Sequence, residues 1–241
     1  MRVMSYNIHF TIGTDNVADW KRIAELIGEY NPDLLALEEV TVNHPHTPGL
    51  NVPEVLGNEL EMHAEFADAI PINDGKGKYG IAALSKYPLE RVGKFYLPTP
   101  EGGEKRVFLV VKVLAEKHFY FVVTHFPFQG EFPGDEECRV ECAAQIMETV
   151  GENNWLPTVW AGDFNTYPGS PTIESIHEKC KVFNDADKLT PTAYCKNAGW
   201  RQIDFICACP KNTFALKNFR FVENMLASDH RPVIADLAWN M

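Results

Sequence analysis

Long apolar runs are missing from this 241-residue sequence, and none of its hydrophobic stretches is long enough to span a bilayer. Its first residues, MRVMSYNIHF, also lack the apolar centre of a secretory signal peptide. We therefore expect no membrane anchor and a cytoplasmic location, while a leader removed before this chain begins stays open.

Basic residues are scarce as well. Lysine and arginine number 22 against 33 aspartates and glutamates, a formal net charge of −11. Proteins that hold duplex nucleic acid electrostatically usually carry a basic surplus, so nucleic acid is a possible but disfavoured partner. An acidic chain can gather carboxylates at a metal site, although acidic surfaces more often serve only solubility.

The six cysteines show no CxxC spacing of the kind that binds zinc. Cys138 and Cys142 are four residues apart on a predicted helix, and Cys207 and Cys209 are two apart on a predicted strand. Such same-face spacing is typical of small core residues. We expect all six cysteines to be reduced and the protein to be intracellular.

Linkers, repeats, low-complexity segments and a glycine-rich nucleotide fingerprint after the first strand are also absent. We therefore predict one domain over residues 1–241. The segment Thr41 to Glu54, TVNHPHTPGLNVPE, is the longest candidate linker, and its composition favours a surface loop.

Runs of β-branched and aromatic residues recur along the chain, and those between Met62 and His125 predict consecutive strands. Residues 16–30 and 135–150 predict two amphipathic helices. Their inward residues are expected to be Val17, Trp20, Ile23, Ala24 and Ile27 in the first helix, and Val140, Ala143, Ala144, Met147 and Val150 in the second. The pattern favours an α/β sandwich in which helices cover two mixed, mostly antiparallel β-sheets, rather than a doubly wound parallel sheet.

Polar side chains end or interrupt many of these strands. They are Asn7, Glu39, His125, Asp163, Asn165, Asp204, Asp229 and His230. Each alone has a structural explanation: Asn7 as a turn residue, His125 as a core histidine, Asp204 as a partner of Arg201. Because burying so many such groups is costly unless they are paired or bound to a cation, together they indicate one shared site.

The segments SYNIHF, PDLLALEEV, YGIAALSKYPL, VVTHF, AGDFNTYPGSP, RQIDFI and ASDHRPVIADL follow one another from near Met1 almost to Met241. This series resembles the motifs of the endonuclease/exonuclease/phosphatase superfamily, the DNase I-like hydrolases. The resemblance implies a four-layer α/β sandwich and divalent-metal-dependent hydrolysis of phosphoester bonds.

The resemblance also suggests roles for the polar residues. Glu39 is the expected ligand of Mg²⁺ or Mn²⁺, with Asn7 beside it and Asp229 completing the shell directly or through water. Zinc is disfavoured because no histidine–cysteine cluster has its spacing. A departure is the pair Glu38–Glu39, since the family often has glutamine before the metal-binding glutamate. Strand alternation predicts that only one of the two faces the site.

For the chemical step, His230 is a candidate base oriented by Asp204, and Asp163 positions or deprotonates the attacking water. Which of Asp163 and His230 takes the proton stays open. Asn165 is expected to bind a phosphoryl oxygen, and His125 to donate a hydrogen bond to the phosphate. The AP-endonuclease branch typically has tyrosine at the position of His125, which counts against abasic-site cleavage.

Substrate-binding residues are harder to assign. Phe126, Phe128 and Phe132 could form an aromatic lip, although a packed loop is the slightly favoured explanation. Arg106 resembles a family arginine at the edge of the site, and it could join a cationic rim with three lysines, namely Lys76, Lys78 and Lys105. We expect a monomer that hydrolyses a phosphoester. A DNA-repair nuclease and a lipid or inositol head-group phosphodiesterase are alternatives, and a catalytically silent binding module is disfavoured.

Overall fold

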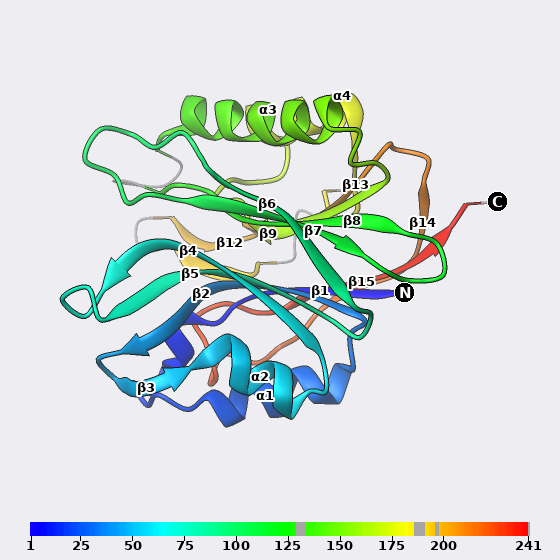
Figure 1. The fold of residues 1–241 in the computed structure, drawn as a ribbon. Helices are drawn as coiled ribbons and strands as arrows, with labels where there is room; N and C mark the ends of the chain where they lie inside the picture. The colour runs from blue at the N-terminus through cyan, green and yellow to red at the C-terminus, as the bar shows by residue number, and fades with distance from the viewer. Residues whose placement is uncertain (129–133, 186–190, 196–197, 241) are drawn as a thin grey trace.

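Two β-sheets pack face to face in the computed structural model, which describes residues 1–128, 134–185, 191–195 and 198–240 (Figure 1). Helices α1 and α2 cover the outer face of the first sheet, and α3 and α4 cover the outer face of the second (Figure 1). The predicted sandwich of two mixed sheets flanked by helices is confirmed.

The first sheet has the strand order β14-β15-β1-β2-β5-β4, with β3 paired to β2. Only β1 and β2 run parallel among these pairs. Its strands are β1 (Arg2–Asn7), β2 (Leu34–His44), β3 (Thr47–Asn51), β4 (His63–Ile72), β5 (Gly77–Ser85), β14 (Phe214–Phe221) and β15 (Val233–Trp239).

The second sheet has the order β10-β13-β9-β8-β7-β6, and β8 and β9 are its parallel pair. Its strands are β6 (Leu89–Tyr96), β7 (Val107–Val113), β8 (Phe119–His125), β9 (Thr158–Asp163), β10 (Lys181–Val182) and β13 (Asp204–Cys209). A separate two-stranded sheet joins β11 (Ala193–Cys195) and β12 (Gly199–Arg201). The run of strands predicted between Met62 and His125 is therefore divided between the two large sheets.

The first predicted helix is shorter than expected. Helix α1 spans Trp20–Tyr30, because the Asp19 side chain accepts a hydrogen bond from the backbone of Lys21 and starts the helix there. Asn31 ends it in the left-handed conformation. Val17, expected on the buried stripe, precedes the helix and is 51% exposed.

Helix α3 spans Glu136–Glu152, close to its expected bounds, but its buried face is displaced. Ala143 and Val150 are buried as predicted, together with Arg139, Cys142 and Ile146, whereas Val140, Ala144 and Met147 are only half-buried. The sequence pattern misses this because an arginine occupies the innermost position. Three further short helices lie outside the predicted ranges: the 3₁₀ helix η1 (His9–Thr11), α2 (Val52–Glu59) and α4 (Pro171–Lys179).

The segment from Thr41 to Glu54 is not a surface loop. It contains the end of β2, strand β3 and the start of α2. Asn43, at the turn of this hairpin, bonds both Gly49 and the backbone of Lys76, and so ties the hairpin to the neighbouring β4–β5 turn.

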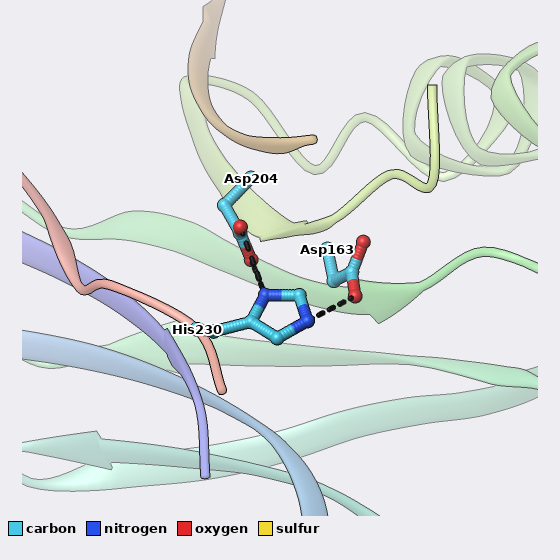
Figure 2. A group of neighbouring side chains, drawn as sticks. All are labelled: Asp163, Asp204 and His230. Carbon is cyan, nitrogen blue, oxygen red and sulfur yellow. Dashed lines mark hydrogen bonds and ion pairs between the residues drawn. The ribbon is translucent and has the colours of Figure 1, made fainter. Parts of the chain in front are cut away.

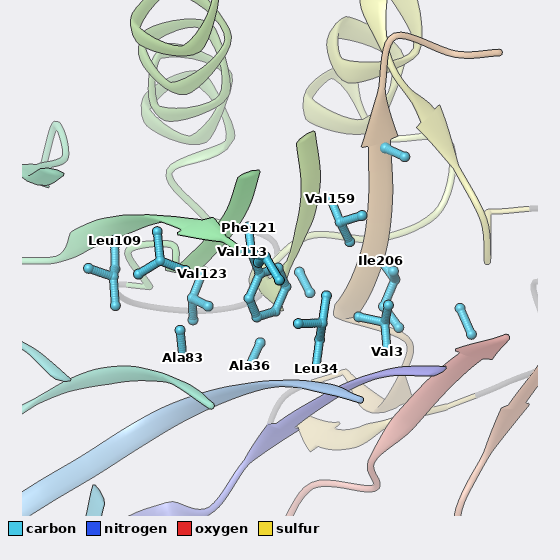
Figure 3. Packing of buried hydrophobic residues seen from close by; sticks show 14 of the residues in the cluster. Val3, Leu34, Ala36, Ala83, Leu109, Val113, Phe121, Val123, Val159 and Ile206 are labelled. Carbon is cyan, nitrogen blue, oxygen red and sulfur yellow. The ribbon is translucent and has the colours of Figure 1, made fainter. Parts of the chain in front are cut away.

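Three apolar clusters stabilise the layers. The central one lies between the sheets, where Val3, Ala36, Phe121 and Val159 interdigitate (Figure 3). The other two lie beneath the helix pairs. Because side chains alternate along a strand, Phe121 and Val123 of β8 face the first sheet while Val122 faces α3. This alternation decides which polar side chains reach the space between the sheets.

The cysteines correct another prediction. Cys180 and Cys209 form a disulfide between the end of α4 and the end of β13, so the expectation that all six are reduced is wrong for this pair. Their separation of 29 residues gives no local spacing signal. The other four are free cysteines, which lie at positions 138, 142, 195 and 207. In the described part of the chain, no helix has the length and apolarity required to cross a membrane.

Candidate active site

Three polar residues form a row across the second sheet. His125 at the end of β8 is the direct neighbour of Asp163 at the end of β9, and Asp163 lies opposite Asp204 at the start of β13. All three continue the inward alternation of their strands, and all are at least 97% buried. The strand register therefore brings together two carboxylates and an imidazole from distant parts of the sequence.

The first sheet contributes the opposing side of the site. Asn7, the last residue of β1, donates from Nδ2 to Glu39 Oε1 and to Asp163 Oδ2, both at 3.2 Å. Its Oδ1 accepts a hydrogen bond from the His9 backbone at 3.1 Å. Asn7 thus links the two sheets at the point where their inner faces end.

Glu38 and Glu39 lie on an irregularity of β2, where the register shifts between Leu37 and Val40. Glu39 has a φ of 55°, which breaks the alternation of the strand. Glu38 is paired with Asn7 in the parallel ladder and is fully buried, and neither of its carboxyl oxygens has a hydrogen-bond partner among the described residues. Burial, with the nearby charges of Asp204 and Asp163, raises its pKa well above the usual range.

Both glutamates therefore lie close to the other site residues, because the irregularity at Glu39 interrupts the alternation on which the expectation of a single inward glutamate rests. Burial raises the pKa of Glu39 too, while Arg106 and His230 oppose this rise. Glu39 is the member that bonds Asn7.

His230 bridges the two aspartates (Figure 2). Its Nδ1 lies 3.0 Å from Asp204 Oδ2 and its Nε2 lies 3.8 Å from Asp163 Oδ2. Burial alone would lower the pKa of His230, but the charge and hydrogen bond of Asp204, with Asp163 beyond, raise it well above its ordinary value. This favours the imidazolium form of the ring.

The turn before β15 places this histidine. Ser228 Oγ donates to the carbonyl of Asn7 at 2.7 Å and accepts from the backbone N–H of His230 at 3.2 Å. The intervening Asp229 has a half-exposed side chain, and its Oδ1 lies 3.9 Å from His9 Nδ1. Ser228 was not among the predicted site residues, and its position directly before the Asp229–His230 pair is the only signal the sequence offers.

Asp163 Oδ2 is the atom on which the site converges. Besides Asn7 and His230, it has His125 Nε2 at 3.4 Å, and its other oxygen accepts the backbone N–H of Asn165 at 2.9 Å. Burial and the charge of Asp204 raise the pKa of Asp163 to about 7. This carboxylate can exchange a proton near neutral pH.

Sequence comparison decides the family. Residues 4–230 match the Endonuclease/Exonuclease/phosphatase family. The chain belongs to this family. Members of the family hydrolyse phosphoester bonds.

Solved structures share the fold. A Beutenbergia cavernae endonuclease/exonuclease/phosphatase is 24% identical with a TM-score of 0.78, over all of this chain and 72% of that one. A mannosyl-6-phosphatase from Bacteroides thetaiotaomicron is 18% identical with a TM-score of 0.73, over 99% of this chain and 100% of that one. The human Nocturnin catalytic domain, solved with bound sulfate, is 17% identical with a TM-score of 0.71, over 100% of this chain and 93% of that one.

The residues of this candidate site suit a hard divalent cation. Glu38, Glu39, Asp163 and Asp204 outnumber the nearby cations, and Glu38 in particular is buried without a partner among the described residues. Ligand atoms of Asp163, Asp204 and His230 lie within 4.8 Å of one another. Oxygen donors predominate, which is the donor set that Mg²⁺ and Mn²⁺ prefer.

The predicted aromatic lip is only partly available. Phe126 is fully buried, with its ring stacked on Phe164 at 5.0 Å and its edge toward Trp160, so it cannot contact substrate. Phe128 is 41% exposed, and Phe132 lies outside the described residues. The packed-loop explanation is therefore right for Phe126.

Two further contacts differ from the simplest reading of the sequence. Asp204 is paired with His230 and not with Arg201, whose guanidinium bonds the carbonyl of Trp200. Asn165, with a φ of 48°, donates from Nδ2 to the carbonyl of Phe126 at 3.0 Å. Asn165 therefore ties the end of β9 to the segment after His125.

Proposed function

We propose that the protein is a metal-dependent phosphodiesterase or phosphatase in which Asp163 activates the attacking water. The observation that supports this most strongly is the convergence of Asn7, His125 and His230 on one oxygen of a buried aspartate whose pKa is raised to about 7. A base with a pKa near the working pH is well suited to accept a proton from water.

Glu39 is the proposed principal ligand of Mg²⁺ or Mn²⁺, with Asp229 beside it. Asp229 lies close enough to raise the pKa of Glu39 electrostatically. Asn7 orients Glu39 through its amide, and its oxygen faces the His9 backbone in this structure. A bound divalent cation would neutralise the phosphoryl oxygens and stabilise the leaving oxygen.

The protonation states divide the acid–base roles. Asp204 favours the imidazolium form of His230, in which both ring nitrogens carry a proton, so this ring is poorly suited to accept a proton from water. Asp163 therefore accepts the proton, and His230 stabilises the negative charge that develops on the phosphoryl group. Asp204 keeps His230 oriented and charged.

His125 and Asn165 supply neutral hydrogen-bond donors to the phosphoryl oxygens. His125 lies at the edge of the row next to Asp163, and burial and the charge of Arg106 lower its pKa well below the ordinary value. It therefore stays a neutral donor. Asn165 lies two residues beyond Asp163 and is 8% exposed.

For the substrate, we propose a small phosphorylated molecule rather than long duplex DNA. The net charge of −11 disfavours a polyanion, and His125 replaces the tyrosine typical of the AP-endonuclease branch. The fold is shared with a sugar phosphatase and with a domain that binds sulfate.

A substrate panel tests the proposal. Sugar phosphates, nucleotides, a simple phosphodiester, sphingomyelin and a DNA duplex with an abasic site are assayed with Mg²⁺ or Mn²⁺, then with a chelator. We expect chelator-sensitive hydrolysis that favours the small substrates. Preference for the abasic duplex would support a DNA-repair nuclease, and preference for sphingomyelin a lipid enzyme. Absence of all metal-dependent hydrolysis would refute the proposal.

A further inference from the structure

Arg106, directly before β7, contacts His125 at the edge of the row of polar residues. Its side chain is only 11% exposed. Its Nη1 contacts three groups: His125 Nδ1 at 3.0 Å, Glu104 Oε1 at 3.0 Å and the hydroxyl oxygen of Tyr79. Tyr79 is itself 3% exposed in β5, and its ring packs against Phe10 with centroids 5.5 Å apart. The guanidinium is therefore held in place from both sheets.

This contact determines where the proton of His125 lies. A guanidinium can only donate hydrogen bonds, so a hydrogen bond from Nη1 requires Nδ1 of His125 to accept it through its lone pair. The single ring proton is then on Nε2, and Nε2 faces Asp163 Oδ2 at 3.4 Å. The Arg106 donor at Nδ1 and the Asp163 acceptor at Nε2 both favour the tautomer that carries its proton on Nε2.

The second histidine of the site has the opposite arrangement. His230 places its Nδ1 against the carboxylate of Asp204, an acceptor, which favours a proton there and a charged ring. His125 places its Nδ1 against a cation. Both histidines point Nε2 at the same oxygen of Asp163. They differ in the group that contacts Nδ1, which is a carboxylate for His230 and a guanidinium for His125.

We propose that Arg106 is a positioning residue that holds His125 in the Nε2–H tautomer, with this N–H directed at Asp163 and at the phosphoryl oxygen. The second half of this role rests on the proposed hydrolase function. Tyr79 contributes to the same arrangement, because its hydroxyl oxygen accepts a hydrogen bond from the guanidinium and holds Nη1 against His125. The role of Arg106 is therefore to act through His125 rather than to bind substrate directly.

The tautomer can be measured without any activity. Two-bond ¹H–¹⁵N correlation spectra of the histidine rings, in the metal-free and substrate-free protein, distinguish the two tautomers and the doubly protonated ring. We expect wild-type His125 to show only the Nε2–H form. Arg106→Met should add a second tautomer or a second proton, and Arg106→Lys should preserve the wild-type pattern. A proton on Nδ1 in wild type, or an unchanged pattern in Arg106→Met, would overturn the proposal.

Kinetics then separate positioning from a merely structural role. Loss of a group that orients an active-site histidine typically costs about 10–100-fold in activity. We expect Arg106→Met to lower kcat by this amount with little change in KM, Tyr79→Phe to lower it less, and Arg106→Lys to recover most of it. In a His125→Ala background, Arg106→Met should cost less than about 3-fold, since the residue it acts through is gone.

Additive losses in that double variant would overturn the role assigned to Arg106. If wild type lacks metal-dependent hydrolysis altogether, the proposed function fails, and the ring spectra still decide the tautomer. Circular dichroism and the melting temperature of each variant verify that it is folded.

Discussion

Asp163 and Asp204 lie directly opposite each other in the antiparallel ladder of β9 and β13, with both side chains in the space between the sheets. Burial and the repulsion between two carboxylates this close raise the pKa of Asp163 to about 7, while the ring of His230 lies against both.

The pH dependence of hydrolysis follows from these states. Activity should rise with pH through about 7 as Asp163 loses its proton, and fall at higher pH as His230 loses its charge. Measuring kcat/KM from pH 5 to 10 tests this bell-shaped profile.

Asp204→Asn provides the matched control for that profile. Loss of the Asp204 charge lowers the pKa of both Asp163 and His230, so both limbs should move toward lower pH and the maximum should fall by about 10²–10⁴-fold. If both limbs of the pH profile stay at the same pH in Asp204→Asn, Asp163 and His230 are not the groups that produce them.

Glu38→Gln should stabilise the metal-free protein. The folded-state pKa of Glu38 lies above its unfolded value, so its contribution to stability is lost as pH rises from about 4 through the folded pKa. Chemical unfolding with a chelator present should show a gain of roughly 1–3 kcal/mol at pH 8 and almost none below pH 4. The exposed Glu116→Gln is the control. A gain that does not depend on pH would contradict this explanation.

Alanine variants of Phe126 and Phe128 should distinguish a role in core packing from a role in substrate binding. Phe126→Ala removes a fully buried ring and should cost about 3–5 kcal/mol of unfolding free energy. Phe128→Ala should change stability by less than about 0.5 kcal/mol. If Phe128 contacts substrate, this variant raises KM for substrates with an apolar or aromatic group and leaves KM for a minimal diester unchanged. Equal effects on both substrate classes would remove Phe128 from the binding surface.

Addition of Mg²⁺ or Mn²⁺ should raise the melting temperature of the wild type, because a ligand that binds only the folded state stabilises it. Glu39→Gln should abolish most of this increase, whereas Glu59→Gln, an exposed residue at the end of α2, should keep it. An undiminished increase in Glu39→Gln would place the cation elsewhere.

How far the sequence predicts the site depends on whether a residue lies on a regular strand. His125, Asp163 and Asp204 lie at or near the ends of apolar runs, so a shared site could be expected from the sequence. Glu38 and Glu39 could not be resolved in this way, because the left-handed conformation of Glu39 breaks the alternation.

Other features depend on contacts that a linear pattern does not contain. Phe126 resembles a surface aromatic in a proline-containing turn, yet the ring stack with Phe164 buries it. Arg106 directly precedes β7 and His125 ends β8, and only the folded structure shows which ring nitrogen the guanidinium contacts. The pairing of Cys180 with Cys209 likewise requires α4 to pack beside the end of β13.

The central claim is that Asp163 activates water for metal-dependent phosphoester hydrolysis. The most direct test compares the hydrolysis rate of a simple phosphodiester by wild type, Asp163→Asn and the exposed control Asp74→Asn, each with Mg²⁺ and with a chelator. We predict chelator-sensitive turnover in wild type and Asp74→Asn, and a loss of at least about 10²-fold in a folded Asp163→Asn protein. Wild-type turnover in Asp163→Asn would contradict the account.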